Sequence, residues 1–109
     1  MGQGSRIVST LFERAKPFGG RFHFGAVCVP AESLLAFLEA EAMAGHSIFY
    51  IECLYIHADN GTEPSLELSR TLQEDEGMTE LIDFARSAVA AAVEGAQSRH
   101  ASAFFELDE

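Results

Sequence analysis

Cysteine and long hydrophobic runs are both scarce in this sequence. The two cysteines, Cys28 and Cys53, lie inside apolar segments and belong to no Cys-x-x-Cys pair, so we expect buried free thiols and no zinc site. No run is long enough to span a bilayer, and the start of the chain lacks the pattern of a signal peptide. These absences predict a cytoplasmic protein with no cofactor and no membrane contact.

Basic residues are few as well. Seven lysines and arginines stand against seventeen aspartates and glutamates, which gives a net charge of -10. A field of this sign repels free DNA, RNA and anionic membranes, so direct binding to them is not expected. It attracts proteins with a basic surface, including those that normally bind nucleic acid. An acidic surface also keeps an ordinary protein soluble, and net charge alone does not separate these interpretations.

The sequence does contain enough apolar material for one core. Its 109 residues are 48% hydrophobic, which suits a single domain. We predict one α+β domain over residues 1–109, with an N-terminal extension at 1–16 and a core at 21–107. Apolar residues at helical spacing favour a helix in the extension, although short apolar pairs there also allow a strand.

The predicted core alternates strands and helices. Apolar periodicity predicts strand, helix, strand, strand, helix and strand, at residues 21–29, 30–44, 46–58, 66–72, 78–96 and 102–107. This order is that of the ferredoxin-like split βαβ fold (βαββαβ), an antiparallel sheet with two helices on one face. In that fold the first and third strands are central, and the second and fourth form the edges.

Residues 48–56 form the most apolar stretch, and it is hydrophobic on both faces, as in strands that are covered on both sides. At the edge of a ferredoxin-like sheet such a strand is an aggregation hazard. A three-layer sheet with this strand in its centre would need a crossover, and residues 59–65 are too short for one. We therefore expect the N-terminal segment, a second copy or another protein to cover the strand.

Glu52 is the one carboxylate within that stretch, on the strand face that carries Tyr50. A carboxylate among apolar neighbours acquires a raised pKa and can act as a general acid or base. Together with His57 and His23 it forms our set of catalytic candidates. The alternative is a structural role, either in a pair with Arg70 across the predicted hairpin or in a dimer interface.

The histidines give little support to a metal site. His57 and Asp59 lie two positions apart at the end of a strand, and His23 would have to supply the third ligand. No two histidines have the i, i+4 spacing of a helical metal pair. We predict no metal.

Aromatic and acidic residues are the candidates for contact with a partner. Two pairs of aromatics, Tyr50 with Tyr55 and Phe104 with Phe105, point to opposite faces of their strands. One member of each pair is therefore presented away from the helices or to a partner. Acids cluster in the loop at 74–76 and in the tail at 106–109. Core packing and a solvated surface are the alternatives. The predicted binding residues are Tyr50, Tyr55, Glu74, Asp75, Glu76, Phe104, Asp108 and Glu109.

One short stretch resembles a known family. Residues 42–46, which run into the apolar strand, are similar to the first helix-to-strand unit of DsrE-type sulfur-transfer subunits. The resemblance implies a sulfur relay. The later, helix-rich half of that family has no counterpart in this chain.

Two further functions remain open. The first is a small acidic protein-binding module, such as an inhibitor, an immunity-type protein or a regulator that docks on a basic or nucleic-acid-binding protein. The alternative is a dimeric α+β-barrel enzyme or binding protein with a small-molecule pocket near Glu52 and His57. The sequence shows no complete catalytic constellation, which favours the binding module and, with the apolar strand, a basic partner, a homodimer or both.

Overall fold

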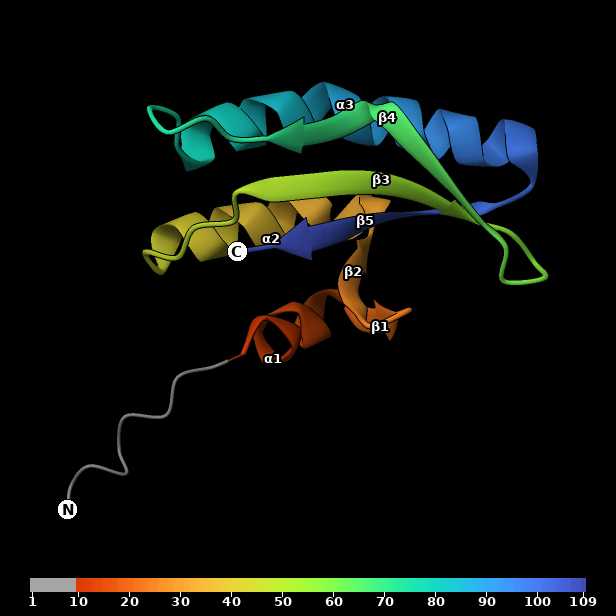
Figure 1. Ribbon diagram of the computed structural model, residues 1–109, viewed down its shortest axis with the longest axis horizontal. Coiled ribbons are helices and arrows are strands. Elements are labelled where there is room, and N and C mark those ends of the chain that lie inside the picture. The colour runs from red at the N-terminus through yellow and green to blue at the C-terminus, as the bar shows by residue number, and fades with distance from the viewer. Residues whose placement is uncertain (1–9) are drawn as a thin grey trace, which may run out of the picture.

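The structure is a computed structural model that describes residues 10–109 (Figure 1). Its elements are α1 (Leu11–Ala15), the 3-10 turn η2 (Lys16–Phe18), β1 (Arg21–His23), β2 (Ala26–Pro30), α2 (Ala31–Met43), β3 (Tyr50–Ile56), β4 (Thr62–Thr71), α3 (Met78–Arg99) and β5 (Ser102–Asp108). The predicted α+β class is confirmed. The helix of the N-terminal extension is confirmed from residue 11 onward, and its first residues lie outside the described part. No helix within residues 10–109 is long and apolar enough to cross a membrane.

All five strands belong to one antiparallel sheet, in the order β1-β2-β5-β3-β4. The chain after α3 therefore returns to the middle of the sheet, where β5 pairs with both β2 and β3. The ferredoxin-like arrangement is not confirmed, because it would place the strands predicted at 21–29 and 66–72 in the centre. In this structure the corresponding strands, β2 and β4, lie on either side of the central pair β5 and β3.

The prediction of an edge position for the apolar stretch 48–56 was wrong. β3 has a strand on each side, with Ile51 paired to Leu107 of β5 and to Arg70 of β4. Its apolar character on both faces agrees with the predicted cover of both faces, because Ile51 belongs to the core and Leu54 and Ile56 are buried as well. The hazard that led us to expect self-association is therefore absent for this strand.

The main core lies between the sheet and the two long helices. Both α2 and α3 lie behind the sheet in Figure 1. Side chains from one face of β3 and β5 pack against both helices in a single buried cluster, which includes Ile51, Cys53, Tyr55, Phe105, Leu34, Phe37, Leu81 and Ala85. Because strand side chains alternate, the other face of β3 and β5 turns away from the helices.

A tight hairpin replaces the single strand predicted at 21–29. The backbone turns at Phe24 and Gly25, whose φ angles are 49° and 83°, as a two-residue turn with the twist of a hairpin requires. The hairpin folds toward the opposite edge of the sheet, since His23 Nε2 of β1 lies 2.7 Å from Thr62 Oγ1 of β4. Leu54 and Ile56 are buried although they lie on the face away from the helices, so this face is only partly open.

An ion-pair cluster holds α1 against the rest of the fold. Glu41 of α2 is only 3% exposed, although charged side chains are rarely buried unless they are paired. It accepts hydrogen bonds from Arg14 Nε at 3.0 and 3.1 Å and lies 3.2 Å from His46 Nδ1. Arg14 Nη2 also donates to Glu109 at the end of the chain. The sequence pattern missed this burial because the partner of Glu41 comes from a distant segment.

Candidate protein-binding face

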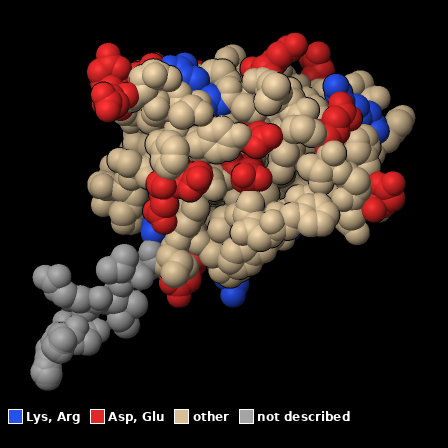
Figure 2. Space-filling model, viewed as in Figure 1, with Lys and Arg blue, Asp and Glu red and all other residues tan. Residues whose placement is uncertain are grey.

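The open part of the sheet carries carboxylates and aromatic rings. We call it the acidic face and define it by Tyr50 and Glu52 of β3 and by Phe104, Glu106 and Asp108 of β5. These residues alternate with the buried core residues of the same strands, which places them away from α2 and α3. Figure 2, which looks onto the sheet, shows carboxylates in the middle of this side of the molecule.

The two central carboxylates stand directly opposite each other. Glu52 pairs in register with Glu106 across β3 and β5, and both side chains are half-buried. Tyr50 pairs with Asp108 in the same ladder, and the Tyr50 hydroxyl donates a 2.7 Å hydrogen bond to Glu52. Like charges at directly opposed positions are destabilising, so this arrangement is unfavourable in the free protein.

The closeness of these carboxylates changes the pKa of two residues on the acidic face. Burial raises the pKa of Glu106, and the charges of Glu52 and Asp108 raise it further. Burial, together with the hydrogen bond to Glu52, raises the pKa of Tyr50 to about 12. The Tyr50 hydroxyl therefore stays protonated at neutral pH and remains a donor to Glu52.

Bases among residues 10–109 offset the charge of the acidic face only in part, because burial and the neighbouring carboxylates raise the pKa of Glu106 more than the charge of His23 lowers it. The ion pairs in this part of the chain join Arg70 to Glu76, Arg86 to Asp83, and Arg99 to Glu63, while Arg14 binds Glu41 and Glu109. Arg21 places its guanidinium carbon 4.3 Å from the centre of the Phe104 ring. None of these ion pairs includes Glu52, Glu106 or Asp108.

The predicted pair between Glu52 and Arg70 is not formed. Arg70 lies opposite Ile51, whose side chain points to the helices, whereas Glu52 points the other way. Arg70 instead pairs with Glu76 and lies near the Phe84 ring. The register of β3 and β4 decides this, and a bulge near Cys53 shifts that register.

The structure does not bring the three catalytic candidates together. Glu52 lies on the acidic face, while His57 is 3.2 Å from Glu63 and His23 contacts Thr62. No hydrogen bond or ion pair within residues 10–109 joins any two of these candidates. None of the three best-formed pockets in this part of the chain is lined by both Glu52 and His57. No group of His, Cys, Asp and Glu in the same range is placed to hold a metal ion.

Tyr55 is a core residue and not a surface anchor, which corrects its place in the predicted binding set. It is 3% exposed and lies under Arg99, whose guanidinium carbon is 4.3 Å from the centre of its ring. Its neighbour on the strand, Cys53, is buried on the same side, and burial raises the pKa of that thiol to about 11. Both cysteines are free, and β5 separates their strands.

The predicted acidic loop and tail lie at the same end of the sheet. Tyr50 pairs with Thr71 on one side and with Asp108 on the other, and the loop begins just after Thr71. Glu74 and Asp75 of this loop are exposed. Glu76 and Glu109 face internal partners instead, namely Arg70 and Arg14. The sequence prediction therefore overstated the contribution of these two acids to a free surface.

Glu106 is the site residue that the predicted set omitted. The period-two pattern of Phe104, Glu106 and Asp108 placed it on the correct strand face. What the sequence did not reveal is that β3 would be the neighbour of β5 and would bring Glu52 opposite Glu106.

Comparisons of this chain with protein-family models, with curated proteins and with solved structures found no match. They therefore give no support to the resemblance to sulfur-transfer subunits.

Proposed function

We propose that this protein is a binding module that docks its acidic face onto a basic surface of another protein, as an inhibitor or regulator does. The observation that carries the proposal is the directly opposed, half-buried pair of Glu52 and Glu106. Within residues 10–109 no base forms an ion pair with either carboxylate. A lysine or arginine from a partner would replace carboxylate repulsion with charge-assisted hydrogen bonds.

Two aromatic side chains complete the proposed interface. Tyr50 and Phe104 lie half-buried on the same face as the carboxylates and are fixed by contacts with Glu52 and Arg21. Tyrosine and arginine are enriched among the residues that contribute most to protein interfaces. The expected partner surface therefore combines positive charge with an apolar contact.

The test compares two variants of equal net charge. One neutralises the acidic face through Glu52→Gln, Glu106→Gln and Asp108→Asn. The other makes the same number of changes on the two long helices, through Glu39→Gln, Asp83→Asn and Glu94→Gln. We expect the immobilised parent and helix variant to retain the same basic protein from a host lysate, and salt to release it. The face variant should lose it.

Equal retention by the two variants would contradict the proposal, because it would show that net charge and not the acidic face attracts the partner. Retention that does not weaken with salt would contradict its electrostatic part.

A further inference from the structure

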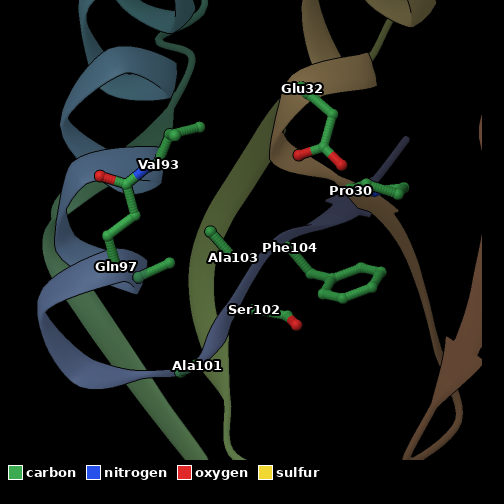
Figure 3. A pocket seen from close by; sticks show the side chains of 9 residues that line it. Pro30, Glu32, Val93, Gln97, Ala101, Ser102, Ala103 and Phe104 are labelled. Carbon is green, nitrogen blue, oxygen red and sulfur yellow. The ribbon is translucent and has the colours of Figure 1, made fainter.

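The structure contains a pocket that shares only Phe104 with the acidic face. It has a volume of about 270 Å³ and lies between the first turn of α2, the last turns of α3 and the start of β5. Figure 3 shows Glu32 on the α2 side and Gln97 on the α3 side, with β5 between them. Small-molecule sites are commonly such concave places between elements, and this volume suits a small ligand.

The lining combines an apolar floor with a few polar groups. Ala96 and Ala103, which are almost buried, leave room where larger side chains would fill the space, and the Phe104 ring forms a wall. Glu32, Gln97 and Ser102 supply the polar atoms. Their side chains form no hydrogen bond or ion pair with another part of residues 10–109, so these groups are available to a ligand.

The charge of the lining selects the ligand class. Glu32 is the one ionisable side chain among the lining residues, and Figure 3 shows its carboxylate on the side of Phe104. The Phe104 ring already has the Arg21 guanidinium over it, so it offers a ligand an apolar contact and leaves Glu32 to bind a positive charge. We infer that the pocket binds a small organic cation, with an apolar body against the alanines and Phe104 and an ammonium group on Glu32.

The test uses three probes of similar size and different charge. Phenethylamine, phenethyl alcohol and phenylacetate are titrated into the isotope-labelled full chain, and backbone amide shifts are followed by NMR. We expect saturable shifts at Ala96, Gln97, Ala103 and Phe104. The amine should bind roughly tenfold more tightly than the alcohol, because a charge-assisted hydrogen bond replaces a neutral one.

Glu32→Gln should remove the preference for the amine, and Glu39→Gln, at another exposed position of α2, should leave it unchanged. Absence of saturable shifts would overturn the inference. Equal binding of amine and alcohol would do the same. Tighter binding of phenylacetate would show that the amides at the start of α2, and not Glu32, determine the ligand. Phe104 is the one lining residue that also belongs to the acidic face, whereas the preference for the amine is tested at Glu32, which lies outside that face. Failure of this test therefore leaves the proposed function untouched.

Discussion

At the scale of single residues, the protein contains carboxylates with opposite effects on stability. A hydrogen bond from Arg99 lowers the pKa of Glu63, and hydrogen bonds from the Gln73 backbone and Arg70 lower the pKa of Glu76. Those two groups favour the folded state once they are ionised. Burial and nearby carboxylates raise the pKa of Glu106, so its ionisation favours the unfolded state instead.

Replacing Glu106 by glutamine should therefore stabilise the protein at neutral pH. Because the pKa of Glu106 is higher in the folded state, its contribution to stability falls as pH rises from the ordinary glutamate range through the raised value. The expected gain from Glu106→Gln is a few tenths to about 1 kcal/mol, the range for a cross-strand pair of like charges. It should grow across this pH window and then stay level. Chemical denaturation at a series of pH values measures it.

The matched control for Glu106→Gln is Glu67→Gln, which changes an exposed carboxylate on β4. The effect of the control should vary little with pH. A loss of stability in Glu106→Gln at neutral pH, or a gain that is equal at all pH values, would contradict this prediction. Either result would show that the ionised Glu106 carboxylate does not destabilise the folded protein.

Gly95 of α3 is a second residue whose role is local. A Cβ atom at this position would overlap the hydroxyl oxygen of Tyr55 and lie 2.9 Å from its Cζ atom. Gly95→Ala should destabilise the protein by about 1–3 kcal/mol as an overpacking substitution, despite the better helix propensity of alanine. In a Tyr55→Phe background the loss should be smaller. A Gly95→Ala protein that is as stable as the parent would show that the ring moves freely aside.

At the scale of elements, local sequence patterns predicted most helices and strands but not their neighbours. The 3.6-residue pattern located α2 and α3, and Gly45, with a φ of 79°, follows the end of α2 in the left-handed conformation that glycine favours there. Strand order depends on long-range pairing, and no local pattern showed that β5 would lie beside β3. The same limit applies to the site. The sequence predicted four of its residues as separate candidates, namely Tyr50, Glu52, Phe104 and Asp108. It did not predict that they would lie on one face around Glu106.

The turn between β1 and β2 was missed because its first residue is unusual. Phe24 has a φ of 49°, which favours glycine or asparagine, and its side chain is 86% exposed. Phe24→Asn should raise the free energy of unfolding by about 0.5–1 kcal/mol, since it relieves backbone strain and loses little buried surface.

Phe22→Asn is the contrasting substitution, because Phe22 stacks on Phe12 with ring centres 4.4 Å apart. It should lower stability. Both proteins can be compared by equilibrium chemical denaturation. A decrease in stability for Phe24→Asn would mean that the contact between the Phe24 and His23 rings outweighs the strain.

At the scale of the whole molecule, the edges of the sheet are poorly suited to pairing with another copy. β1 has three residues, and β4 contains Pro64 and an irregular register with β3. Short, interrupted edges discourage pairing between sheets. We therefore expect the mass of a monomer at micromolar concentration in low and high salt, measured by light scattering. A dimer at both salt concentrations would show that another surface joins two copies.

The acidic face results from both the negative charge of the chain and the order of its strands. The net charge of -10 would favour the approach of a basic surface, and the pairing of β5 with β3 concentrates carboxylates on the open side of the sheet. If this face is the docking surface, its residues should respond first when a partner binds.

The most direct test is amide shift mapping of the isotope-labelled chain with a basic protein captured in the retention experiment. We expect the largest shifts at Tyr50, Glu52, Glu106 and Asp108, and we expect them to fade together as salt is added. Shifts confined to the outer surfaces of α2 and α3, with the acidic face unchanged, would contradict the proposed docking surface.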